Sequence, residues 1–142
     1  MKNIIWATDI HLDCLKEDQI KEWVDREMAS KEADAVLITG DISTASGVID
    51  HLKLLRKLSG KPIYFVLGNH DYWGSSIKGL RNTILNGAFS KNEGIVWLGS
   101  VPYISSENSN TAIVGHDGWY DARYGDAKNS RFAMRDWFVV DE

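Results

Sequence analysis

The sequence of 142 residues has the length of one ordinary domain; it is 44% apolar and 25% charged, and its net charge is −4. This composition excludes a disordered or low-complexity chain, and the acidic balance disfavours a nucleic-acid partner without excluding one. No apolar run approaches the roughly eighteen residues of a membrane-spanning helix, and the run after Met1 is too short for a signal peptide. We therefore expect a cytoplasmic protein without a membrane partner.

The first half of the chain alternates short apolar runs with amphipathic stretches. The apolar runs predict strands at residues 3–8, 35–39 and 63–67. Apolar side chains at helical spacing predict helices at residues 17–31 and 46–58, the second of them capped by Gly60. Apolar strands separated by helices are typical of an α/β fold with a parallel sheet that is covered on both faces.

The second half is less regular. A helix is predicted at residues 75–91, although Gly79 and Gly87 weaken the pattern. Short strands at 95–98, 101–104 and 111–115, with a turn at 105–110, resemble a small antiparallel meander. A loop at 116–129 and a final helix at 130–140 complete the chain.

Polar clusters follow the first three predicted strands. Asp9 and His11 come after the first strand, Asp41 after the second, and Asn69-His70-Asp71 after the third. In open α/β sheets the carboxyl ends of the strands are the edge where ligands bind. Taken singly, each cluster is usually a solvated loop or a turn. Together and in this order, they indicate a metal site.

The ligand types narrow the choice of metal. The clusters offer carboxylate, imidazole and amide groups, and Cys14 is the only cysteine of the chain. Such ligands suit Mn²⁺, Fe or Zn²⁺ rather than a thiolate zinc site. A carboxylate between two ligand groups can bridge two ions, and a two-metal site activates water for phosphoryl displacement.

The motifs Asp9-Ile10-His11, Gly40-Asp41 and Gly68-Asn69-His70-Asp71 resemble the first three signature blocks of the calcineurin-like metallophosphoesterases. The segment 115–121 resembles one found in some bacterial and phage members, so that the resemblance extends from residue 3 to about 125. It implies the N-terminal part of a four-layer α/β/β/α sandwich, with parallel βα units followed by a small meander.

The resemblance also implies roles for individual residues. Asp9 and His11 would bind a first metal ion, Asp41 would bridge two ions, and Asn69 would bind the second. His70 would be the catalytic residue, which polarises the phosphate or protonates the leaving alkoxide. The implied cofactors are two divalent metal ions, with Mn²⁺ favoured over Fe and Zn²⁺, and the implied partner is a phosphate-ester substrate.

The chain departs from the family pattern after the third block. It lacks the later histidine block and the Gly-His-x-His block, because His116 is the only histidine beyond His70 and Gly118 stands where a second histidine would be. We therefore expect residues 1–142 to be a single metallophosphoesterase-like domain that is truncated at its C-terminus, with a site that a partner chain could complete. His116 is interpreted as a substrate-binding residue.

Three hypotheses of function follow. The first is a metal-dependent phosphoesterase that hydrolyses phosphomonoesters or phosphodiesters. The alternative is a catalytically incompetent module that keeps half of the ligand shell and binds metal or protein. The third, a nuclease of the same family, is disfavoured by the acidic balance. Counting ligands predicts one well-occupied metal position at Asp9, His11 and Asp41 and a weaker second one.

Overall fold

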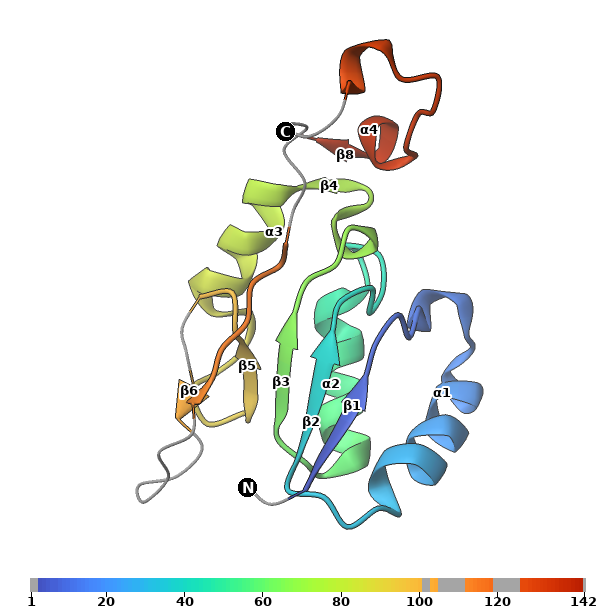
Figure 1. Cartoon of the computed structure of the whole chain (residues 1–142). Coiled ribbons are helices and arrows are strands. Elements are labelled where there is room, and N and C mark those ends of the chain that lie inside the picture. Colours follow the sequence, from blue (N-terminus) through green and yellow to red (C-terminus); the bar gives the residue numbers. More distant parts are fainter. Residues whose placement is uncertain (1–2, 101–102, 105–111, 119–125, 142) are drawn as a thin grey trace.

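A parallel sheet forms the centre of the fold. The computed structural model describes residues 3–100, 103–104, 112–118 and 126–141, and its main sheet has the strand order β1-β2-β3-β5. These strands are β1 (Ile4–Ala7), β2 (Ala35–Thr39), β3 (Ile63–Val66) and β5 (Ile95–Trp97). Each pairs in parallel with its neighbour (Figure 1). The predicted α/β class with a mostly parallel sheet is confirmed.

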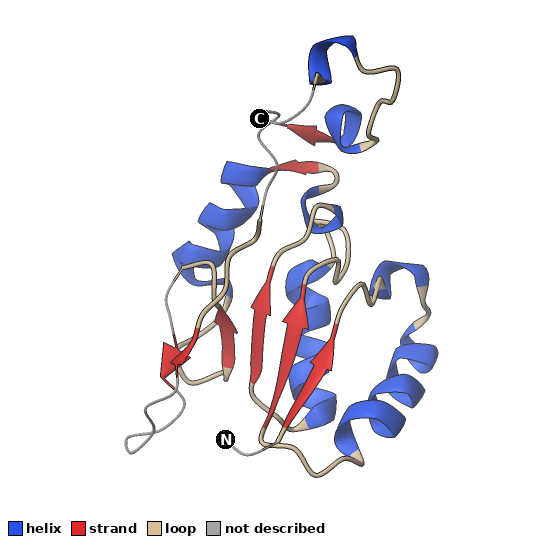
Figure 2. Cartoon of the chain, in the orientation of Figure 1, coloured by secondary structure: helices blue, strands red, loops and turns tan. Residues whose placement is uncertain are grey.

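Three helices connect these strands (Figure 2). They are α1 (Glu17–Val24), α2 (Val48–Ser59) and α3 (Ile77–Thr83). The first continues through a wider helical turn at Asp25–Ala29, and the third through a similar turn at Ile84–Ala88. Gly60 ends α2 with a φ of 69°, as predicted, because a left-handed C-cap favours a residue without a Cβ atom. None of the helices in the described part of the chain has the length and apolar character to cross a membrane.

The two faces of the main sheet are covered unequally. One face packs against all three helices in the larger apolar cluster, through alternate strand residues such as Val36, Ile38 and Phe65. The other face carries a smaller apolar cluster, in which Ala35, Tyr64 and Leu98 are buried. On this second face β1 is open, because 69% of Trp6 is exposed. The expectation that both faces are covered is therefore wrong for the described residues.

The predicted antiparallel meander is only partly present. The run at 95–98 is not part of it, because β5 pairs in parallel with β3 as the fourth strand of the main sheet. The antiparallel pairing that does form joins β6 (Tyr103–Ile104) to β7 (Ala112–Ile113). The turn predicted at 105–110 and residues 119–125 of the loop predicted at 116–129 lie outside the described residues.

The C-terminal segment is not the predicted helix over 130–140. Only one helical turn forms, α4 (Asp136–Val139), and the chain then extends as β8 (Val140–Asp141). β8 pairs in parallel with β4 (Ser75–Ser76), beyond the carboxyl ends of the main strands (Figure 1). The helix predicted from residue 75 accordingly begins at Ile77, after Ser76 accepts a capping hydrogen bond from the Gly79 amide. Backbone pairing between these distant segments prevails over local helix propensity.

Candidate metal centre

The turns that follow β1, β2 and β3 meet at one edge of the sheet, as predicted. The backbone N–H of Asp9 donates to the Gly40 carbonyl at 3.1 Å, and that of His11 donates to the Asp41 carbonyl at 3.0 Å. The backbone N–H of His70 donates to Oδ1 of Asp41 at 3.0 Å. The Asp41 turn therefore lies between the other two turns and contacts both.

Two glycines allow this close approach. A Cβ atom on Gly40 would lie 2.8 Å from the backbone nitrogen of Gly68, and a Cβ atom on Gly68 would lie 2.1 Å from Oδ1 of Asp41. Both distances are shorter than atoms tolerate. Gly40 and Gly68, which precede Asp41 and Asn69, are thus required for packing the two turns, and the φ of 88° at Gly40 adds a conformational requirement.

Backbone strain is concentrated at this edge. Asp9, His11 and Asp41 have φ angles of 52°, 40° and 51°, and within the described residues no other non-glycine residue has a positive φ. Each left-handed residue costs about 1–2 kcal/mol. Strained backbone of this kind clusters at functional sites, where the surrounding structure holds it in place. The same three residues are those expected to bind the first metal ion.

Their side chains form a group that one ion could join. Ligand atoms of Asp9, His11 and Asp41 all lie within 4.8 Å of one another, and His11 Nε2 is 3.8 Å from Asp41 Oδ2. Two atoms that bind one ion at about 2.0–2.2 Å are at most about 4.4 Å apart, so the group is near the required spacing. Two carboxylates and one imidazole are a donor set that fits a divalent transition metal.

His70 lies beside this group and is held from three sides. Its Nε2 is 3.2 Å from Oδ2 of Asp13, its ring packs edge-on against His11 at 4.6 Å between centroids, and the Trp73 ring lies 4.0 Å away on another side. His11, Asp13 and His70 form a second group whose possible ligand atoms lie within 4.8 Å of one another. No role was predicted for Asp13. Its position two residues after His11 is the one feature of the sequence that could have identified it as a further possible ligand.

Asp71 joins the turns from inside the protein. It is fully buried, and its carboxyl group accepts hydrogen bonds from the backbone N–H groups of Ile42, Ser43 and Gly68 at 2.8–2.9 Å. Burial raises the pKa of Asp71 to about 7, although the three hydrogen bonds favour the charged form. Because these bonds use its oxygens, Asp71 connects the β2 and β3 turns rather than facing the ligand group.

Asn69 contacts the C-terminal segment. Its Nδ2 donates to Oδ1 of Asp136 at 2.7 Å, and Trp73 Nε1 donates to the same oxygen at 2.9 Å. Burial acts to raise the pKa of Asp136, but the hydrogen bonds from Trp73 and Asn69 outweigh it and leave the pKa below its usual value. Asp136 is therefore a carboxylate at neutral pH. The sequence analysis missed this residue because nothing in its local pattern relates it to Asn69.

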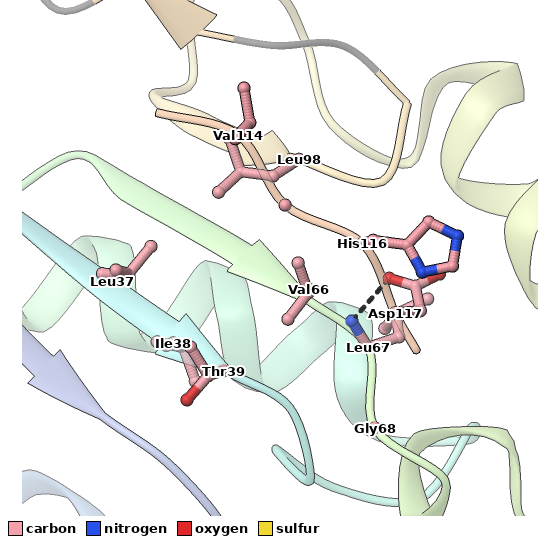
Figure 3. A pocket seen from close by; sticks show the side chains of 11 residues that line it. Leu37, Ile38, Thr39, Val66, Leu67, Gly68, Leu98, Val114, His116 and Asp117 are labelled. Carbon is pink, nitrogen blue, oxygen red and sulfur yellow. Dashed lines mark hydrogen bonds between the residues drawn. The ribbon is translucent and has the colours of Figure 1, made fainter. Parts of the chain in front are cut away.

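His116 lies apart from the ligand group, on the sheet face that the helices do not cover. It is exposed, its Nδ1 accepts from the Gly118 amide at 2.9 Å, and it borders a cleft of about 340 Å³ (Figure 3). The cleft is mainly apolar, with Leu37, Val66 and Leu98 among its lining residues. It also reaches Thr39 and Gly68, which directly precede the turns that carry Asp41 and Asn69.

Asp117, next to His116, is a buried point of attachment for the β7 segment. Only 2% of its side chain is exposed, and it pairs with Arg81 at 2.8 Å. It also accepts hydrogen bonds from the Leu67 amide, the Tyr72 hydroxyl and Trp97 Nε1 at 2.9–3.1 Å. Burial, together with the charge of Asp117, raises the pKa of Tyr72, so the Tyr72 hydroxyl remains a neutral donor. This network fixes the chain just before the Asn69 turn.

The sequence of this chain is similar to those of one known protein family. The profile of the calcineurin-like phosphoesterases matches residues 2–140. Among solved structures, the phosphopantetheinyl hydrolase from Mycobacterium tuberculosis is similar, with 18% identity and a TM-score of 0.48. The match covers 72% of this chain, which spans 36% of the hydrolase chain. A comparison with curated proteins gave no match. Because the family profile covers nearly the whole sequence, the chain belongs to the calcineurin-like phosphoesterase family.

Proposed function

We propose that this chain carries the metal-binding half of a phosphoesterase site that hydrolyses phosphomonoesters or phosphodiesters. The observation that supports the proposal most directly is the placement of Asp9, His11 and Asp41. They are strained into left-handed backbone conformations and bring two carboxylates and an imidazole together at the carboxyl edge of the sheet. A purely structural turn has no need of three such residues.

Each residue of the candidate metal centre has a proposed role. Asp9, His11 and Asp41 would hold one divalent ion, and Asp41 with Asn69 would hold a second. Bound divalent ions supply Lewis acidity and lower the pKa of water, with Mn²⁺ as the favoured metal. His70 would bind the phosphate or deliver a proton to the leaving alkoxide, because Asp13 and Trp73 hold its ring beside the ligand group. His116 would contact the part of the substrate that lies in the apolar cleft.

The number of protein ligands at each metal position limits the hydrolysis expected of this chain alone. The first metal position has three protein ligands, which is the usual minimum for a catalytic site, whereas the second has two, one of them a neutral amide. Two cations a few ångströms apart also repel each other. The second position is therefore expected to be the weaker, and hydrolysis by the chain alone slow. This count also favours the alternative function, a catalytically incompetent module that keeps half of the ligand shell and binds metal or protein.

The experiment measures metal content and hydrolysis in the same samples. The purified chain is incubated with Mn²⁺ and assayed with p-nitrophenyl phosphate and bis-p-nitrophenyl phosphate, beside the variants Asp9→Asn and Asp126→Asn. Asp126 is an exposed aspartate outside the ligand group and serves as the control. We expect Mn²⁺ binding and p-nitrophenol release that Asp9→Asn abolishes and Asp126→Asn leaves unchanged. Binding without release would support the module, and no Mn²⁺ binding would refute both.

A further inference from the structure

The side chain of Asp136 reaches Asn69 from a segment far along the chain. Its Oδ1 accepts the 2.7 Å hydrogen bond from Asn69 Nδ2 across 67 positions of sequence, and the residue is only 6% exposed. Asn69 itself is exposed, and it directly precedes His70 of the second ligand group. A buried carboxylate thus holds the NH₂ end of an exposed amide side chain.

The chemistry of the two groups decides how the Asn69 amide is turned. A carboxylate only accepts hydrogen bonds, so it favours the NH₂ end of the amide and would repel the carbonyl oxygen. With Nδ2 directed toward Asp136, Oδ1 lies on the opposite side, and no described residue donates a hydrogen bond to it. Amides bind divalent cations through this oxygen, so the orientation matches that of a metal ligand.

Contacts that involve no ligand residue bring Asp136 close to Asn69. The Gly74 amide donates to the Val139 carbonyl at 2.7 Å, and Ser75 pairs with Val140 where β4 meets β8. The Arg135 guanidinium also lies 4.7 Å from the centre of the Trp73 ring. The short turn of α4 between these contacts directs the Asp136 carboxylate toward Asn69. The placement of Asp136 therefore depends on contacts outside the ligand residues.

We propose that Asp136 is a positioning residue, which fixes the Asn69 amide with its oxygen toward the second metal position. This rests on the proposed function, in which Asn69 binds the second ion. Removing the hydrogen-bond partner of a metal ligand typically weakens metal binding about 10–100-fold. The loss is expected at the weaker of the two positions, because the ligands of the stronger one do not contact Asp136.

The first test needs no metal. In ¹⁵N-labelled protein, the side-chain NH₂ of Asn69 should exchange with water at least about tenfold faster in Asp136→Ala than in the parent, since a charge-assisted hydrogen bond is worth this factor or more. Asp141→Ala is the matched control, because Asp141 is an exposed aspartate of the same segment. Equal exchange in the parent and in Asp136→Ala would overturn the proposal, whatever the protein does with metals.

The second test titrates Mn²⁺ and follows free Mn²⁺ by electron paramagnetic resonance. We expect Asp136→Ala to weaken the second position about 10–100-fold and to leave the first unchanged. Asp136→Asn should restore most of the affinity, because its amide oxygen still accepts from Asn69. The double variant Asn69→Ala/Asp136→Ala should bind no more weakly than Asn69→Ala alone, because Asp136 acts through Asn69.

The results of these tests distinguish a failure of the positioning role of Asp136 from a failure of the proposed function. Additive losses in the double variant, or equal weakening at both positions, would overturn the positioning role. Failure of Asp136→Asn to restore binding would show that the charge of Asp136 acts directly on the ion, which would also overturn it. Faster exchange in Asp136→Ala with no Mn²⁺ binding by the parent would uphold the orientation of Asn69 and refute the proposed function.

Discussion

Replacing Asp117 by asparagine tests whether the network around this buried carboxylate holds the β7 segment to the sheet. Oδ1 accepts from the Leu67 amide and Trp97 Nε1, and Oδ2 accepts from the Tyr72 hydroxyl and Arg81. An asparagine has one acceptor oxygen, so its NH₂ must face two of these four donors in either orientation. Two of the four donors therefore lose their acceptor, and at least one of these two is buried.

The expected loss of stability follows from the number of donors left without an acceptor. Leaving one buried donor unsatisfied costs about 1–3 kcal/mol, and removing one partner of a buried ion pair costs about 3–5 kcal/mol. Part of the second cost is relieved here, because Arg81 is one-third exposed and regains contact with water. We expect Asp117→Asn to lower the free energy of unfolding by about 3–5 kcal/mol. For a chain of this length, the corresponding fall in Tm is about 10–20 °C.

Urea denaturation followed by tryptophan fluorescence measures the effect, with Asp126→Asn as the control. Asp126 is exposed and, among the residues that the structure describes, accepts only from Asn129, so its replacement should change the free energy of unfolding by less than about 1 kcal/mol. The variant Arg81→Met, alone and combined with Asp117→Asn, measures the coupling between the two charges. A loss below about 1 kcal/mol in Asp117→Asn would refute the account of four simultaneous hydrogen bonds.

Three further predictions concern the candidate metal centre. Asp41→Asn should lower the metal content more than Asn69→Ala, since a bridging carboxylate contributes charge to two cations; mass spectrometry of bound metal decides this, and equal retention would contradict the bridging role. His70→Ala should leave the metal content near that of the parent while lowering kcat about 10²–10⁴-fold; loss of metal would instead identify His70 as a ligand. Gly40→Ala should destabilise the protein by about 2–4 kcal/mol, because its φ is 88° and its Cβ would meet Gly68. Thermal denaturation compares it with Gly60→Ala, which has a φ of 69° but no atom near the added Cβ and should cost about 1 kcal/mol; equal losses would rule out the steric explanation.

Local sequence patterns were sufficient for much of the architecture. The run at 35–39 predicted β2 without error, and Gly60 marked the end of α2, because burial periodicity and left-handed caps depend on neighbouring residues. The parallel arrangement of the first three strands followed from their apolar character and spacing. The order of the three polar motifs was enough to bring their turns to one edge, since the carboxyl ends of parallel strands coincide.

The errors occurred where the outcome depends on a distant segment. The run at 95–98 has the composition of any short strand, and only the free edge of β3 made it a parallel strand of the main sheet. The helix predicted at 130–140 is reduced to one turn, and at its end Val139 and Val140 pair with Gly74 and Ser75 through backbone hydrogen bonds that helix propensity does not register.

The sequence by itself thus determined the fold class and the set of residues, Asp9, His11, Asp41, Asn69 and His70, that the carboxyl ends of the strands present together. The tertiary structure decided which other groups hold them. Asp13 beside His70, Asp136 beside Asn69 and the buried contacts of Asp117 each join segments that are many residues apart. Such pairings depend on distances of a few ångströms after folding, and a hydrogen bond between distant residues has no local pattern by which the sequence reveals it.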